Sequence, residues 1–177
     1  QVISGTVTVN YTYDGDGTLV KKSVVNGDTT VYVGSIYEKN LTSGEITKYY
    51  YAGAKRIAMR KGSQVYYLLT DQLGSTSSTV YPDGTNRKNS VYYSFGGTKS
   101  DDGITTDKRF TGQQAEDPVG LYYYGARMYD ASIGRFISAD TIVPNPRNPQ
   151  SLNRYAYGYN NPVKYSDPSG HCASDDQ

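Results

Sequence analysis

Apolar and polar residues alternate in short segments along the first half of the chain. In residues 6–13 the side chains of Val7, Val9, Tyr11 and Tyr13 fall on one face, with the two-residue period of a β-strand. Turn signals such as Asp-Gly and Asn-Gly follow at about the 8–12-residue spacing of an all-β fold. The further strands expected from this alternation are residues 18–25, 30–35, 36–41, 46–52, 55–59, 64–70, 77–81 and 88–95. The pattern predicts a meander of antiparallel hairpins.

The second half of the chain differs from the first in composition and lacks its regular alternation. Residues 96–106 read as a polar loop, and residues 108–170 are rich in Gly, Pro, Asn and Arg, with short strands expected at 121–124 and 135–137. Proline excludes long regular elements there, and Ser151 would cap one short helical turn over residues 151–157. The fold class is therefore all-β: a curled array of hairpins closed by an irregular Pro/Gly-rich cap. We expect the array at 1–96, the cap at 97–170 and a polar tail at 171–177.

The amino-acid composition of the chain excludes several classes of function. The 177 residues include 20 Tyr, 3 Phe and no Trp. A Tyr side chain can bury its ring while its hydroxyl stays in solvent, so Tyr suits the half-exposed face of a sheet. The formal net charge is +1, so no bulk field draws the chain to nucleic acid or to a membrane. The single cysteine, Cys172, excludes an internal disulfide and a Cys-cluster zinc site. No metal site and no cofactor are expected, and no apolar run could insert in a membrane.

One hairpin motif occurs twice. Tyr11 and Tyr13 alternate on a strand, Asp14 ends that strand, and Gly17 supplies a left-handed turn position before the chain returns. A looser copy places Asp71 and Gly74 at the same turn positions, after a Tyr-containing strand. A single hairpin is not stable alone, so such units must stack to bury a continuous face.

These units resemble the YD repeat of the RHS family, and the second half resembles the RHS-associated core. The segments that carry the core resemblance are residues 109–113 (RFTGQ), 120–130 (GLYYYGARMYD), 134–140 (GRFISAD), 153–157 (NRYAY), 160–163 (NNPV) and 167–170 (DPSG). The resemblance implies a secreted or cell-surface bacterial protein in which long hairpin arrays spiral into a hollow shell. In many members the core closes one end and a variable C-terminal toxin is enclosed.

We therefore expect a structural shell or scaffold module, with no turnover of external substrates. Its expected partners are upstream repeats of the same protein or other copies, joined through sheet edges, with a cell-surface glycan or protein as a further partner. An alternative is a self-assembling or adhesive subunit that pairs through its edges into a fibre or tube. The first strand, near Val7, would be a free edge, and we expect that edge to be covered.

A second alternative is a core that cleaves itself. The resemblance implies an aspartyl-protease-like pair, Asp140 and Asp167, which cuts after the motif Asp167, Pro168, Ser169, Gly170, with Arg135 orienting the carboxylates. Such a pair needs two close carboxyl groups that carry different protonation states. The other interpretation is that both aspartates form turns. The family usually has Leu where this chain has His171, and we expect the bond after Gly170 to be intact. His171 and Cys172, adjacent on a polar tail, are not expected to form a catalytic pair.

Overall fold

The computed structural model describes residues 1–143, 146–171 and 174–175, and it confirms the all-β class. Within these residues the helices are short 3₁₀ turns, which make up 6% of the chain. The strands are β1 Val2–Ser4, β2 Val7–Tyr13, β3 Leu19–Val24, β4 Thr29–Val33, β5 Tyr37–Asn40, β6 Ile46–Ala52, β7 Lys55–Lys61, β8 Gln64–Thr70, β9 Thr76–Val80, β10 Lys88–Tyr92, β11 Thr98–Asp101, β12 Gln114–Glu116, β13 Leu121–Tyr123, β14 Met128–Asp130, β15 Arg135–Phe136, β16 Tyr165–Ser166 and β17 Ser174–Asp175. The 3₁₀ helices are η1 Phe110–Gly112, η2 Pro149–Leu152 and η3 Gly158–Asn160.

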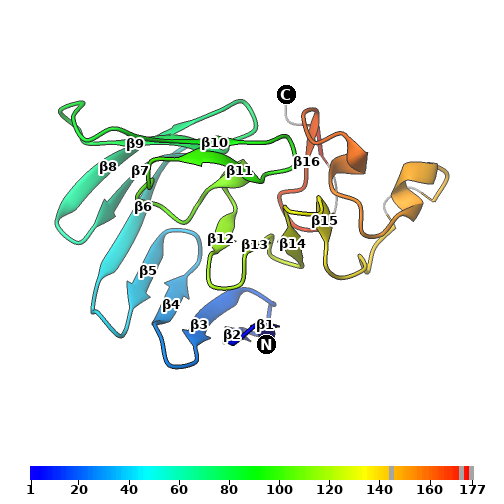
Figure 1. Ribbon diagram of the computed structural model, residues 1–177, viewed down its shortest axis with the longest axis horizontal. Coiled ribbons are helices and arrows are strands. Elements are labelled where there is room, and N and C mark those ends of the chain that lie inside the picture. Colours follow the sequence, from blue (N-terminus) through cyan, green and yellow to red (C-terminus); the bar gives the residue numbers. More distant parts are fainter. Residues whose placement is uncertain (144–145, 172–173, 176–177) are drawn as a thin grey trace. The chain divides into compact units, whose positions relative to one another are not determined.

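Strands β1 to β11 follow one another in sheet order exactly as in sequence order, without a crossover (Figure 1). Each of β1 to β7 pairs antiparallel with the next strand in the chain. This is the meander of hairpins that the alternating pattern predicts. None of the described helices is long and apolar enough to cross a membrane.

The chain divides into two compact units that interleave along the sequence. The first comprises Gln1–Leu69, Ser78–Lys88 and Asp117–Val119, and the second comprises Thr70–Ser77, Asn89–Glu116 and Gly120–Gln177. The first unit contains β1 to β7 and a small core of Tyr49, Met59 and Leu68. On β6, Tyr49 is 5% exposed and its neighbour Tyr50 is 44% exposed. Successive side chains of the strand therefore alternate between a buried face and a solvent-exposed face.

The expected first strand is not the edge of the sheet. Strand β1 precedes β2 and pairs with it antiparallel, with Ile3 opposite Thr8, so β1 covers the start of β2 within the chain. The prediction that the strand near Val7 is the edge of the sheet was therefore wrong, because the edge strand is β1. The Val2–Ser4 segment has only three residues, which are too few to show alternation, although Ser4 and Gly5 mark the turn that follows it.

The two copies of the repeat motif form the same turn. In each, the aspartate Oδ1 accepts hydrogen bonds from the backbone N–H groups two and four positions later, Asp16 and Thr18 for Asp14, and Leu73 and Ser75 for Asp71. Gly17 and Gly74 donate to the carbonyl of the respective aspartate at 3.2 and 3.1 Å and take φ of +80° and +81°. The aspartate side chain thus closes the turn that the glycine makes sterically accessible.

The second unit holds a four-stranded antiparallel sheet, β12 to β15, and β16 pairs with β17. Two expectations for this region were wrong. The loop expected at 96–106 contains strand β11, and the helical turn begins at Pro149, capped by the Asn148 side chain, which accepts from the N–H of Gln150 at 3.1 Å. Ser151 lies inside that turn and not at its cap. The boundary expected at residues 96–97 between the hairpin array and the cap stays a prediction.

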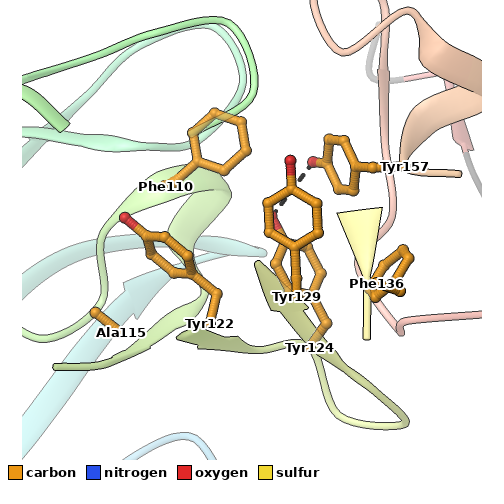
Figure 2. Packing of buried hydrophobic residues seen from close by; sticks show 7 residues of the cluster. All are labelled: Phe110, Ala115, Tyr122, Tyr124, Tyr129, Phe136 and Tyr157. Atoms are coloured by element: carbon orange, nitrogen blue, oxygen red, sulfur yellow. Dashed lines mark hydrogen bonds between the residues drawn. The ribbon is translucent and has the colours of Figure 1, made fainter. Parts of the chain in front are cut away.

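An aromatic cluster forms the core of the second unit (Figure 2). Its buried members are Phe110, Ala115, Tyr122, Tyr124, Tyr129, Phe136 and Tyr157. The ring of Tyr124 meets those of Tyr129, Phe136 and Tyr157 edge-on, with centroids 5.4–5.6 Å apart, which is the favoured geometry for aromatic pairs. These rings come from β13–β15 and from the segments that follow them, so the cluster fixes the loops beyond the sheet.

Candidate functional site

A single buried guanidinium organises the polar site of the second unit. Arg127, directly before β14, has a side chain only 6% exposed, and its Nη2 lies 2.9 Å from Oδ2 of Asp140 and 3.1 Å from Oδ2 of Asp167. Its Nη1 donates to the carbonyl oxygen of Arg154 at 2.8 Å. The guanidinium also lies 3.6 Å from the centre of the Phe136 ring, so the aromatic core positions it from one side. The two aspartates, far apart in sequence, therefore share one nitrogen.

The same arginine contacts the peptide bond that follows the DPSG motif. The Nε of Arg127 donates to the carbonyl oxygen of Gly170. On the other side of that bond, the backbone N–H of His171 donates to Oδ1 of Asp167 at 3.0 Å. Both halves of the Gly170–His171 peptide are thus held by site residues. One peptide bond therefore has a guanidinium donor at its carbonyl oxygen and a carboxyl group at its nitrogen.

The side chain of His171 belongs to the site as well. Its Nδ1 lies 3.0 Å from Oδ1 of Asp140, and the imidazole is 34% exposed, whereas the Asp140 side chain is 7% exposed. The same Oδ1 accepts the backbone N–H of Ile142 at 2.9 Å. His171 was expected on a loose tail and is instead bound by both aspartates. Cys172 lies outside the described residues.

Gly170 is a steric requirement of this arrangement. Its φ is +76°, and a Cβ at this position would lie 2.6 Å from the carbonyl oxygen of Tyr124 and 3.2 Å from the backbone nitrogen of Arg127. No side chain fits there without moving backbone. The glycine of the DPSG motif therefore allows the chain to pass close enough for Arg127 to reach its carbonyl.

Buried tyrosine hydroxyls connect the aromatic core to Asp167. The hydroxyl of Tyr124 lies 2.8 Å from Thr111 Oγ1 and 3.4 Å from the hydroxyl of Tyr157, the contact drawn as a dashed line in Figure 2. The hydroxyl of Tyr157 in turn accepts a hydrogen bond from the backbone of Asp167. Burial raises the pKa of both phenols, that of Tyr124 well above its ordinary value, so both stay neutral and able to donate.

A small cavity opens beside the two carboxylates. The volume of this cavity is about 30 Å³, which is enough for one or two water molecules. It is lined by Arg127, Asp140, Asp167 and His171 together with Ser151, among others. Ser151 is 5% exposed, and its hydroxyl has no hydrogen-bond partner among the described residues. A buried hydroxyl without a partner, beside a polar cavity, is commonly satisfied by a hydrogen bond to an ordered water.

The structure places the residues expected from sequence as follows. Asp140 and Asp167 are brought together, and the cleavage motif ends against them. Arg135 is exposed on β15, opposite Asp130, and the guanidinium between the carboxylates is that of Arg127. Arg127 stands in the quoted segment 120–130, but nothing in its spacing from either aspartate identified it as their partner. His171, Arg154, Tyr157 and Ser151 were not expected at the site.

The consecutive hairpins with their Asp-closed turns, and the aromatic core of the second unit, are features of a YD-type β-shell module. Residues 2–163 match the model of the Teneurin YD-shell family, and the chain belongs to this family. This confirms the resemblance that the motifs indicate.

Relatives and solved neighbours agree with this assignment. The tRNA nuclease WapA of Bacillus subtilis is 30% identical over 179 residues, which cover 91% of this chain and 7% of that protein. The toxin subunit YenC2 of Yersinia entomophaga is 35% identical over 102 residues, covering 54% of this chain and 10% of the relative. The crystal structure of TcdB2-TccC3 without its hypervariable C-terminal region superposes with a TM-score of 0.74 at 25% identity, over 92% of this chain and 9% of that one.

The chain is thus a structural shell module, as the sequence predicts. It spans about a tenth or less of the length of the relatives named above. The nuclease activity in the name of WapA is a property of that protein.

Proposed function

We propose that β1 to β8 form part of the wall of a longer bacterial β-shell protein that is secreted or lies on the cell surface, and that another strand of that protein pairs with the outer edge of β1. The observation that carries the proposal is the uninterrupted meander of β1 to β11, in which β1 has β2 as its one neighbour among the described strands. Relatives that are many times longer, among them toxin subunits, support it.

The backbone of Ile3 is the part of β1 that faces this partner. The carbonyl of Thr8 accepts the N–H of Val25, so the polar backbone groups of Thr8 point toward β3. Ile3 lies directly opposite Thr8 and is therefore at a non-hydrogen-bonded position of the β1–β2 pair. Its N–H and C=O point away from β2, and its side chain is 66% exposed. This is a template for an additional antiparallel strand.

Sedimentation of the 177-residue chain over a range of concentrations tests the edge. With no upstream strand attached, we expect copies to associate through β1. Ile3→Pro removes the outward N–H without touching the β1–β2 ladder and should keep the chain monomeric, whereas the matched control Ile3→Val should associate like the wild type. A wild-type chain that stays monomeric at every concentration, or an Ile3→Pro chain that associates equally, would contradict pairing at this edge.

We also propose a second activity, slow self-cleavage of the Gly170–His171 bond. The specific observation in its favour is that this one peptide bond is contacted on its carbonyl side by Arg127 and on its nitrogen side by Asp167, with Asp140 within reach of the same arginine. The cavity beside the carboxylates has room for the attacking water.

Asp140 takes a proton from water as the water oxygen attacks the carbonyl carbon of Gly170. Arg127 stabilises the negative charge that develops on the carbonyl oxygen. Asp140 then delivers the proton that it took from the water to the nitrogen of His171 as the C–N bond breaks, while Asp167 holds that nitrogen in place through its N–H. The products are a new carboxyl terminus at Gly170 and a new amino terminus at His171.

Intact-mass spectrometry of the purified chain over days tests this activity. We expect a slow loss of residues 171–177 that Asp140→Asn and Asp167→Asn each abolish. Loss of other masses, or loss of residues 171–177 that continues in both variants, would point to a contaminating protease and would refute self-cleavage.

A further inference from the structure

His171 occupies the lone pairs of Asp140 that a water would need. A carboxylate oxygen accepts about two hydrogen bonds, and Oδ1 of Asp140 already has two partners, the N–H of Ile142 at 2.9 Å and Nδ1 of His171 at 3.0 Å. The other oxygen, Oδ2, faces the guanidinium of Arg127 at 2.9 Å. The backbone donor at Ile142 is fixed by the chain, so the imidazole is the partner that a water can replace.

The imidazole is held there by its own backbone. The N–H of His171 is bound to Oδ1 of Asp167, which fixes the Cα of the residue directly after the proposed cleavage point. From that position only Cβ and Cγ separate the backbone from Nδ1, which reaches Asp140. The contact is therefore local and pre-organised, and it competes with a water that must be captured from solvent.

From this geometry we infer that His171 acts as a brake: its Nδ1 competes with the attacking water for Asp140 and slows cleavage of the Gly170–His171 bond. The inference rests on the proposed self-cleavage and names the residue that regulates it. It also accounts for why cleavage is slow in a chain that has both aspartates and the cleavage motif. The groups that face the imidazole site are Asp140, Asp167 and Arg127, and all three belong to the site.

The brake depends on a hydrogen-bond donor at one place in the side chain. Leucine has no donor, so His171→Leu releases Oδ1 of Asp140 while keeping a side chain of similar size. Asparagine carries its amide nitrogen at the distance from the backbone that Nδ1 has in histidine, so His171→Asn keeps the donor and serves as the matched control. Replacing one charge-assisted hydrogen bond changes a rate by about tenfold or more.

Two measurements test the brake. The chain contains one histidine, so the nitrogen resonances of a single imidazole report the contact directly. When the pH is high enough for the imidazole to be neutral, donation to Asp140 requires the proton on Nδ1, which is the minor tautomer of a free imidazole. Finding the Nδ1–H tautomer in the wild-type chain is the expected result, and finding the ring with its proton on Nε2 would overturn the proposal.

The second measurement is the self-cleavage rate of three chains by intact mass. We expect His171→Leu to lose residues 171–177 about tenfold faster than the wild type or more, and His171→Asn to cleave at the wild-type rate. Equal cleavage of wild type and His171→Leu, or equal acceleration in both variants, would overturn the brake and leave self-cleavage standing. If no chain cleaves, including His171→Leu with its imidazole contact removed, self-cleavage itself fails and the brake fails with it.

Discussion

The backbone N–H of His171 donates to Oδ1 of Asp167 at 3.0 Å, across the turn that Asp167 itself begins. The aspartate thereby accepts from the residue four positions later, as Asp14 and Asp71 do in the two repeat turns. The DPSG segment is thus a variant of the same Asp-closed turn. Its difference is the second carboxylate oxygen, which is held by Arg127 and connects the turn to the buried site.

Removing the buried cation should destabilise the chain. Arg127→Gln leaves Asp140 and Asp167 facing each other without the positive charge that separates them, and removing one partner of a buried ion pair costs about 3–5 kcal/mol. Urea unfolding monitored by tyrosine fluorescence measures the loss. The control is Arg135→Gln on the exposed face of β15, which should change the free energy of unfolding by less than about 0.5 kcal/mol. Equal effects of the two substitutions would mean that Arg127 does not organise the site.

Gly170 should tolerate no side chain. Gly170→Ala adds a Cβ that would lie 2.6 Å from a backbone oxygen at φ of +76°, so the cost combines a left-handed alanine, about 1–2 kcal/mol, with a steric clash of about 1–3 kcal/mol. Gly17→Ala is the matched control, because its φ is +80° and nothing lies within 4 Å of the added Cβ. It should lose only the conformational part. Thermal unfolding of both variants checks the difference, and equal losses would refute the close approach.

The hydroxyl of Tyr157 should contribute to the stability of the chain in addition to the packing of its buried ring. Tyr157→Phe keeps the aromatic packing but leaves the backbone N–H of Asp167 without its acceptor, at a cost of about 1–3 kcal/mol. Tyr93→Phe, at a residue that is 60% exposed, should be neutral within about 0.5 kcal/mol. Chemical denaturation compares the two. A Tyr157→Phe chain as stable as the control would show that the hydroxyl network carries no free energy.

Alkaline pH should unfold the second unit. Burial raises the pKa of Tyr92 from 10.0 to about 12, and it raises the pKa values of Tyr124 and Tyr157 as well. Because the folded pKa values lie above those of the unfolded chain, the stabilisation is fully present below pH about 10 and is lost as pH rises toward and through 12. Melting temperatures measured from pH 8 to 12 should fall steeply above pH about 10, together with a cooperative rise in phenolate absorbance. A gradual, non-cooperative titration of all tyrosines would contradict their burial.

Local features of the fold could be predicted from sequence and distant ones could not. The alternation around Tyr49 and the Asp14 and Asp71 turns depend on residues within a few positions of one another, so the pattern specifies them. Strand β1 is too short to show alternation, and its pairing with β2 became visible only in the structure. The capping of η2 by Asn148 was missed because Ser151 offers an equally good capping side chain in sequence.

The site shows the same limit. Asp140 and Asp167 were selected through the resemblance, but an arginine that joins two loops is determined by tertiary packing, here by Phe136 behind Arg127. Four arginines stand in the quoted motifs, Arg109, Arg127, Arg135 and Arg154, and nothing in the sequence favours Arg127 over the other three. His171 was set aside for the same reason, since a polar tail carries no signal of what it binds.

The central claim is that this chain is a segment of a β-shell wall whose first strand is continued by another strand. Electron cryo-microscopy of the protein isolated from its native source tests that claim most directly. The account predicts density for an antiparallel strand beside β1, within hydrogen-bonding distance of the backbone of Ile3, in a wall that extends beyond the hairpins described here. A native protein in which the outer edge of β1 faces solvent, with no further strand beside it, would contradict it.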